Sequence, residues 1–515
     1  MPRPRKGGDI CAIFVHAGAG FHSQSNERAH LETCENAAKV AMTMLKNGGS
    51  AVDAVEMAIM LLEDSEITNA GYGSNLTIDG GVECDATVVD HKGRSGAAGA
   101  VAHVKNPISL ARVILEASTR PLSLQRVPPN FLVGPGATDF AYEQGLVILP
   151  HDGLVSEGAR ERWNRWQHDL QMAELNEKQQ HPARYQNDRI KAYFRSATPS
   201  PVQTLASPSS VGDSLRADQR SDDSYDSSQS QEDQAVTSPA NLNSTPPESR
   251  IGHGVKYMDG PSPVASSNST APRFYSRVST RGIQSASVIH SPMADSSAVG
   301  VDTSNSEEVG DKEGSSKAAP VASGINMGTD QISDTVGAIA VDCHGNIAAG
   351  SSSGGIGMKH RGRIGPAALV GIGTAVIPVD PNDHDRTSVA CVTSGTGEHI
   401  ATTLAASTCA SRVYYSERKS ASGAFEEVTE EEAMKAMIDG DFMGHPGVRT
   451  SHCQGAIGIM TVKKTAYGVH LYFGHNTDSF ALASMSSEDK KPTSVMSRSS
   501  GNGSIAQGGR ACRVR

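Results

Sequence analysis

Apolar positions recur with regular spacing in two separate parts of the chain. In the first part, residues 9–16 form the short apolar run of a core strand, and apolar residues at helical spacing predict a helix over 26–46. Ser50, followed by Asp53, forms a capping pair that predicts the start of another helix. Short alternating strands and helices of this kind indicate a layered α/β or α+β domain over residues 9–154.

The second patterned part covers residues 335–485. An apolar run over 335–342 and a turn at 344–346 predict a pair of strands, of which residues 347–353 form the returning strand. Apolar residues at helical spacing predict a helix over 398–417. Residues 486–515 are rich in serine and glycine and predict a flexible tail.

Residues 155–334 separate these parts. A charged helix is expected over 156–180, and residues 195–330 are rich in Ser, Pro, Asp, Gln and Asn, which predicts disorder. This insert can be a simple linker, or it can be a regulated docking or targeting segment. Compact domains rarely contain so long a structureless loop, so the two halves can be separate chains in the working protein. The second chain would then begin at Thr335.

Composition narrows the class of protein. Hydrophobic residues make up 37% and aromatic residues 4% of the 515, which fits a chain with a large unfolded segment. A net charge of −10 argues against a general nucleic-acid binder. No apolar run is long enough to predict a membrane span. Eight scattered cysteines fit a reducing compartment, and no metal-ligand spacing occurs.

A threonine at the first position of a chain can act as a nucleophile without a histidine. Its own α-amine has a reference pKa of about 7.7 to 8, so part of it is neutral and can serve as base. The Thr335 hydroxyl could release that amine by attacking the carbonyl of Asp334, which gives an ester that water hydrolyses. The Asp334-Thr335 pair alone is weak evidence, because Thr335 can equally be a threonine that starts a strand.

Five motifs surround this position. They cover residues 334–346, 352–365, 393–398, 16–20 (His-Ala-Gly-Ala-Gly) and 68–75 (Thr-Asn-Ala-Gly-Tyr-Gly-Ser-Asn). Together they resemble the plant-type asparaginase and isoaspartyl-peptidase family, and within it the threonine aspartase branch. The resemblance covers both patterned halves, with the motifs in the family's order.

The resemblance implies a four-layer αββα sandwich and self-cleavage into α and β chains. It also implies a dimer of αβ units and a chemistry that needs no cofactor. The expected activity is endopeptidase cleavage of proteins after aspartate. By the same resemblance, expected substrates are trithorax-type methyltransferases and the precursor of transcription factor IIA, which places the protein in nucleus and cytoplasm. No direct contact with nucleic acid or membrane is expected.

Position by position, the resemblance makes Thr335 the nucleophile and places Ser353 beside it as a second hydroxyl. Ser394 and Gly395 fall at the oxyanion site, where a hydroxyl and a backbone N–H stabilise the developing negative charge. A serine-rich turn at 353 and a glycine turn at 395 are the structural alternatives.

Arg363 matches the family's arginine for the substrate carboxylate, and its fork suits a bidentate contact. Asn69 is expected to shape the site from the glycine-rich loop, and Gly397 and Arg28 to contact substrate. The alternatives are a solvated surface charge for Arg363 and a turn asparagine for Asn69.

One departure discriminates between activities. Pro366 stands where asparaginase members carry the aspartate that binds the substrate's free amine. An internal peptide residue has no such amine, so Pro366 favours an endopeptidase. An L-asparaginase or isoaspartyl peptidase, and a non-catalytic interaction protein that uses the insert, are the competing hypotheses.

Overall fold

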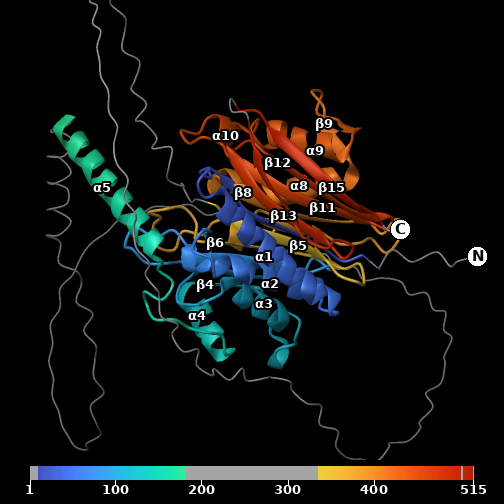
Figure 1. The fold of residues 1–515 in the computed structure, drawn as a ribbon, viewed down its shortest axis with the longest axis horizontal. Coiled ribbons are helices and arrows are strands. Elements are labelled where there is room, and N and C mark those ends of the chain that lie inside the picture. The colour runs from blue at the N-terminus through green and yellow to red at the C-terminus, as the bar shows by residue number, and fades with distance from the viewer. Residues whose placement is uncertain (1–9, 181–333, 500–502, 514–515) are drawn as a thin grey trace, which may run out of the picture. The chain divides into compact units, whose positions relative to one another are not determined.

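Two large β-sheets form the centre of the computed structural model, which describes residues 10–180, 334–499 and 503–513 (Figure 1). The larger sheet has eight strands. In sheet order they are β14 (Thr493–Arg498), β13 (Ser479–Ser486), β1 (Ala12–Gly20), β5 (Val336–Val341), β6 (Ile347–Ser353), β2 (Cys84–Val89), β3 (Ser95–Val101) and β4 (Phe131–Val133). The second sheet has the order β15 (Ala506–Arg513), β12 (Gly468–His475), β11 (Ile457–Thr465), β8 (Ser388–Gly395) and β7 (Thr374–Ile377).

Helices lie against both sheets. Those that contact the eight-stranded sheet are α1 (Glu27–Lys46), α2 (Ala51–Glu63) and α3 (Pro107–Ser118). Those that contact the five-stranded sheet are α8 (Ala405–Tyr415) and α9 (Glu430–Ala436), on the opposite side of the molecule (Figure 1). Strands β5 and β6 contact β8, so the two sheets also face each other. The prediction of a mixed α/β fold is confirmed.

Strand β1 shows why the apolar run near the N-terminus is continuous. Ile13 and Val15 face a core shared with α1 and α2, whereas Phe14 faces a second core between the sheets. All three side chains are fully buried, and each contributes about 1.5–3 kcal/mol by leaving water. A strand buried on both faces has no polar alternation.

The parts before and after the insert pair within one sheet. Strand β5 hydrogen-bonds to β1 on one side, with His16 opposite Gly337, and to β6 on the other. Strand β6 pairs in turn with β2. Strands β5 and β6 of the second half therefore lie between β1 and β2 of the first half, and neither half forms the sheet alone. Residues 195–330, for which the sequence predicts disorder, lie outside the described residues.

Most expected elements are present, with two differences in the second half. The capping box of Ser50 and Asp53 is confirmed at the start of α2, and the strand over 347–353 is β6. The helix expected over 398–417 is divided into α7 (Gly397–Thr402) and α8, because Leu404 adopts a positive φ of 49° between them. Apolar spacing alone does not report such a local break.

The flexible tail expected over 486–515 is wrong for two segments of that range. Residues Thr493–Arg498 form β14 at the edge of the larger sheet, and Ala506–Arg513 form β15 at the edge of the smaller one. Both strands take their order from hydrogen bonds to β13 and β12, so serine and glycine content misleads here. Among the helices within the described ranges, none combines the length and apolar character that a membrane span requires.

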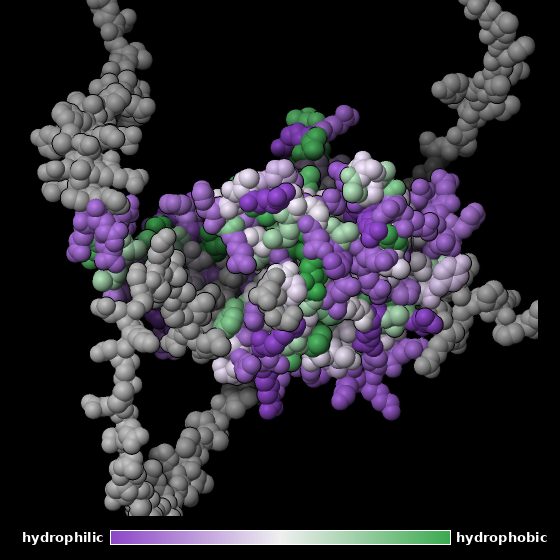
Figure 2. Space-filling view, turned by 90° about the horizontal axis from the view of Figure 1, so that it is seen from above, coloured by the Kyte–Doolittle hydropathy of each residue, from purple (hydrophilic) through white to green (hydrophobic). Residues whose placement is uncertain are grey.

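The remaining helices lie at the periphery. They are α4 (Gly134–Glu143), α5 (Glu157–Gln180) and α10 (Pro446–Arg449). A two-stranded ribbon of β9 (Glu417–Lys419) and β10 (Phe425–Glu427) follows α8. On the face shown in Figure 2, hydrophilic and hydrophobic residues are interspersed.

A buried carboxyl joins α2 to the larger sheet. Glu63 Oε1 accepts hydrogen bonds from the Ser352 hydroxyl at 2.6 Å and from the Ile108 N–H at 2.9 Å. Burial raises the pKa of Glu63 to about 8, although these hydrogen bonds oppose the shift. The folded chain therefore keeps a proton on Glu63 in a pH range where the unfolded chain has lost it.

We expect Glu63→Gln to flatten the pH dependence of stability. Between the ordinary pKa of 4.5 and about 8, the folded wild type binds more protons than the unfolded chain, so its stability falls as pH rises. The slope from this one group is up to about 1.4 kcal/mol per pH unit. Urea unfolding from pH 5 to 8 measures it, with the exposed Glu174→Gln as control. Equal slopes in wild type and Glu63→Gln would contradict the expectation.

Candidate functional site

Thr335 lies immediately before β5, buried at the point where both sheets meet. Its backbone N–H donates to the Ser394 Oγ at 3.2 Å. The same oxygen accepts from the Ala19 N–H at 3.1 Å. Ser394 is on β8 of the five-stranded sheet, so its hydroxyl joins that sheet to β1 and to the Asp334-Thr335 peptide.

Ser353 ends β6 next to this position. The β5–β6 register pairs Val336 with Ser352, and one further step places Thr335 opposite Ser353. Ser353 is buried, and its Oγ accepts from the Gly355 N–H at 3.0 Å. The structure thus brings three predicted hydroxyl residues, Thr335, Ser353 and Ser394, to one end of the paired sheets.

The fully buried Asn69 fixes the turn after Ser353. Its Nδ2 donates to the Gly355 carbonyl at 2.8 Å, and its Oδ1 accepts from the Asn75 N–H at 2.8 Å. The Asn69 carbonyl also accepts from the Gly354 N–H at 2.8 Å. Asn69 therefore shapes the site by holding two loops together, one from each half of the chain.

Helix α5 braces the same loop from outside. Trp163 Nε1 donates to the Thr77 carbonyl at 3.0 Å, and Arg162 Nη2 donates to the Gly73 carbonyl at 3.0 Å. The Trp166 ring lies so close to Gly357 that a β-carbon there would collide with it. The helix expected over 156–180 is thus present, and its first turns support the site.

Arg363 lies in a recess formed by glycines. A β-carbon on Gly397 would come within 2.6 Å of its Nη2, and one on Gly365 within 2.8 Å of its Nη1. The Arg363 Nη2 and Nε donate to Glu398 Oε1 at 2.9 and 3.1 Å. Burial raises the pKa of the Glu398 carboxyl, but the hydrogen bonds and charge of Arg363 lower it overall. Arg363 therefore already binds one carboxylate, and that carboxylate is 61% exposed.

Asp85 was missed by the sequence analysis. It is fully buried on β2, where it accepts from the Ala100 N–H at 2.8 Å and the Gly365 N–H at 2.7 Å. Burial raises its pKa, against the opposing effects of Lys359 and these N–H groups. An aspartate inside an apolar strand is the signal that could have revealed it. Asp85 holds the loop that carries Arg363.

The Asp334 side chain occupies a separate pocket beside β1. Its Oδ2 lies 3.0 Å from His22 Nε2, and both side chains are at most 4% exposed. β-Carbons on Gly18 or Gly20 would collide with this carboxyl group. Gly18 also has a φ of +89°, which L side chains rarely adopt. The glycines of the 16–20 motif therefore leave room for Asp334.

Two glycines and one arginine complete the placement of the predicted residues. Gly395 has a φ of 140° and approaches the Ala456 carbonyl, so no side chain fits there. Gly397 borders the Arg363 recess. Arg28 is not brought to the site: its side chain is 89% exposed on α1 and pairs with Glu32 at 2.7 Å.

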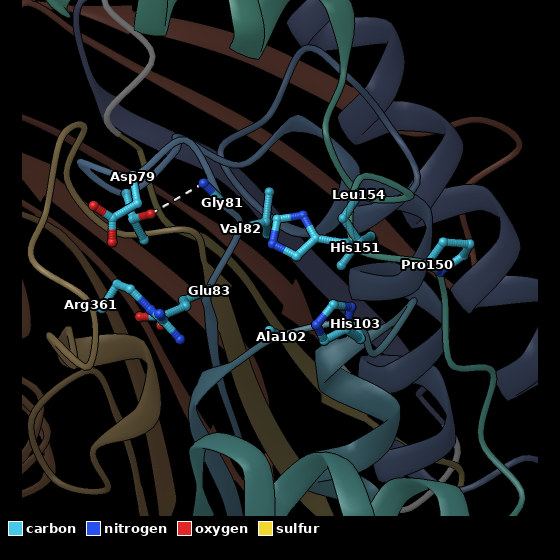
Figure 3. Close-up of a pocket in the computed structure, with 11 residues that line it drawn as sticks. Asp79, Gly81, Val82, Glu83, Ala102, His103, Pro150, His151, Leu154 and Arg361 are labelled. Carbon is cyan, nitrogen blue, oxygen red and sulfur yellow. Dashed lines mark hydrogen bonds and ion pairs between the residues drawn. The ribbon is translucent and has the colours of Figure 1, made fainter.

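A cavity of about 150 Å³ lies outside this group, and none of the predicted residues lines it. Glu83 and Arg361 lie on one side of it, with His103 and His151 on the other (Figure 3). Glu83 and Arg361 also border a neighbouring cavity of about 540 Å³. Arg361 thus faces these cavities, whereas Arg363 faces Gly397 and Glu398.

Comparison with known proteins now identifies the family. The sequence profile described as asparaginase matches residues 10–196 and 286–471, which is more than half of the chain. The chain belongs to the asparaginase family. This confirms the resemblance to plant-type asparaginases and isoaspartyl peptidases.

Individual relatives agree with the family. The chain is 39% identical over 160 residues to a human isoaspartyl peptidase/L-asparaginase, covering 30% of this chain and 49% of the relative. It is 41% identical over 170 residues to a plant-type L-asparaginase of Pyrococcus abyssi, covering 32% and 51%. The matches span about half the length of these relatives of the asparaginase family. Neither of these two names refers to a threonine aspartase.

We expect Gly18→Ala to destabilise the chain more than Gly48→Ala, with both made in a Thr335→Ala background so that the hydroxyl plays no part. The two glycines have nearly equal φ values, +89° and +86°, but Gly48 has open space where a β-carbon would lie. Gly48→Ala costs about 1–2 kcal/mol for the backbone conformation alone.

The collision with Asp334 adds about 1–3 kcal/mol at Gly18. Urea unfolding measures the difference, and intact mass verifies that both chains are uncut. Equal losses of stability would show that Asp334 does not occupy this space in solution.

Proposed function

We propose that the protein is an N-terminal-nucleophile hydrolase that cuts its own chain between Asp334 and Thr335 and then cleaves proteins after aspartate. The observation that carries this proposal is the buried Asp334-Thr335 peptide between β1, β6 and Ser394. Contacts among two sheets and two sets of helices support the four-layer αββα sandwich that such an enzyme needs.

Self-cleavage requires the Thr335 hydroxyl, the Asp334-Thr335 peptide and one water molecule. The Thr335 Oγ attacks the Asp334 carbonyl carbon, the C–N bond breaks, and the hydroxyl proton passes to the departing amine. The resulting ester takes up water and yields the Asp334 carboxylate and the free hydroxyl. Thr335 then carries a free α-amine that serves as its base.

In cleavage of a second protein, the hydroxyl residues take distinct roles. Thr335 attacks the backbone carbonyl carbon of the substrate's aspartate, and Ser353 forms a hydrogen bond with the Thr335 hydroxyl. Ser394, with the Gly395 backbone, stabilises the oxyanion. Contact of Ser394 with the Thr335 nitrogen supports this placement, because the hydroxyl is already within reach of the reacting atoms.

Arg363 binds the side-chain carboxylate of the substrate and so selects aspartate. Its guanidinium lies in the glycine recess beside Gly397, and its Glu398 partner is exposed enough to be displaced. Pro366 starts a short buried turn next to Gly397, and its ring offers no acceptor for a substrate ammonium. This supports an internal aspartate as substrate. By the resemblance, we propose trithorax-type methyltransferases and the precursor of transcription factor IIA as such substrates.

The alternative is an L-asparaginase or isoaspartyl peptidase. The family and the names of the relatives favour it. Release of aspartate from β-aspartyl dipeptides, or of ammonia from asparagine, would support this activity. In that case Pro366→Asp should increase turnover by restoring an ammonium partner, whereas an endopeptidase gains nothing from it.

We expect the wild type to separate into two chains, the second of which begins at Thr335, and Thr335→Ala to stay whole. Intact mass and N-terminal sequencing measure this directly. A wild-type chain that stays whole on long incubation would refute the proposed enzyme and favour an interaction protein. A Thr335→Ala chain that still splits at 335 would refute the nucleophile.

We expect Arg363→Gln to lower kcat/KM on a peptide with an internal aspartate by at least about 100-fold, because a bidentate contact to a carboxylate is lost. Arg361→Gln is the matched control, since this exposed side chain pairs with Glu83 at 3.6 Å and not with Glu398. Similar losses in both variants would refute the assignment of Arg363.

A further inference from the structure

The aspartate before the scissile bond is bound by different groups from those proposed for a substrate's aspartate. In the intact chain, Asp334 Oδ2 lies 3.0 Å from His22 Nε2. The Arg363 guanidinium is instead engaged with Glu398. The carboxylate of the self-cleavage site therefore does not occupy the recess of Arg363.

We infer that His22, with Gly18 and Gly20, forms a second aspartate site that serves self-cleavage alone, while Arg363 serves the substrates cleaved afterwards. The inference rests on the proposed function, because it assigns His22 to the first of two reactions at Thr335. His22 is a positioning residue: it holds the Asp334 side chain and through it the carbonyl carbon that Thr335 attacks.

His22 is itself firmly held. Its backbone N–H donates to the Ser479 Oγ at 2.9 Å, and its Nδ1 lies 2.9 Å from the same oxygen. The Arg498 Nη2 donates to the His22 carbonyl at 3.1 Å, and the His30 ring packs against the imidazole edge-on. A ring fixed by two strands beyond β1 can fix the carboxylate that contacts it.

The ring nitrogen that faces Asp334 must carry a proton. Nε2 lies 3.1 Å from the Ala17 carbonyl oxygen, which can only accept a hydrogen bond, and 3.0 Å from Asp334 Oδ2. The Ser479 hydroxyl can donate to His22 Nδ1 or to the Gly20 carbonyl, 3.3 Å away. In both arrangements Nε2 remains the donor to Asp334.

The space left by Gly18 and Gly20 also fits the Asp334 side chain. β-Carbons on Gly18 and Gly20 would overlap the Asp334 carboxyl group, so the pocket is shaped around a short branched side chain. Among the described residues, Asp334 Oδ1 has no hydrogen-bond partner, which leaves His22 as the donor that orients the carboxyl group.

The test compares rates of self-cleavage of freshly synthesised full-length chains, followed by the fraction cut over time. Orientation errors of about 1 Å can slow a reaction on the order of 100-fold. We expect His22→Gln to slow cutting by at least about tenfold, and Arg363→Gln to slow it much less. His475→Gln is the control for loss of a buried histidine, because His475 binds Thr477 and Ser497 instead of Asp334.

A double-mutant cycle separates positioning from folding. Asp334→Ala removes the partner of His22, so adding His22→Gln to it should slow cutting little further. Thermal unfolding in a Thr335→Ala background compares His22→Gln with His475→Gln, and the two midpoints should fall by similar amounts. Independent, additive effects of the two substitutions at 22 and 334 would overturn the inference.

The remaining outcomes are also decisive. The second aspartate site is overturned if His22→Gln cuts itself at the wild-type rate, or if His22→Gln and Arg363→Gln slow self-cleavage equally. Thr335 remains the nucleophile in both cases. Loss of cutting in the wild type, or cutting in Thr335→Ala, instead removes the proposed function on which the inference rests.

Discussion

Hydrogen bonding of β5 between β1 and β6 is the constraint on which the rest of the structure depends. It places β5, which follows the insert in sequence, beside β1, which comes from the half before the insert. The register also fixes which residues meet at the strand ends, since Thr335 must lie opposite Ser353. Both faces of β1 and β5 are buried, so a slip by one residue would exchange two cores at once.

The sequence predicts the local elements of this arrangement well, because their causes are local. Ser50 and Asp53 cap a helix through neighbouring atoms. The strand over 347–353 follows a short turn after 335–342 and pairs with that neighbouring segment. The edge strands near the C-terminus were missed for the opposite reason. Their order comes from pairing with β12 and β13, which no property of a serine- and glycine-rich segment reports.

The same distinction applies to the site. Thr335, Ser353, Ser394 and Arg363 were found because motifs mark them, and the structure brings the three hydroxyl residues among them together. His22 and Asp85 act through contacts with residues far away in sequence, Asp334 and Gly365, and no spacing rule connects these pairs. Arg28 was expected from a nearby motif position, but its side chain points away from the site on α1. Proximity in sequence is a poor guide once a helix has begun.

The closed pair of Arg363 and Glu398 changes what recognition means in this protein. A substrate carboxylate does not bind an unpaired arginine. It displaces the Glu398 carboxylate, which carries the same charge, from Arg363. Much of the Coulomb energy cancels in such an exchange, and the balance depends on the second N–H bond and on the solvation that the exposed Glu398 regains. A ligand that offers one weak oxygen gains nothing over the resident side chain. A substrate must therefore bind Arg363 more favourably than Glu398 does.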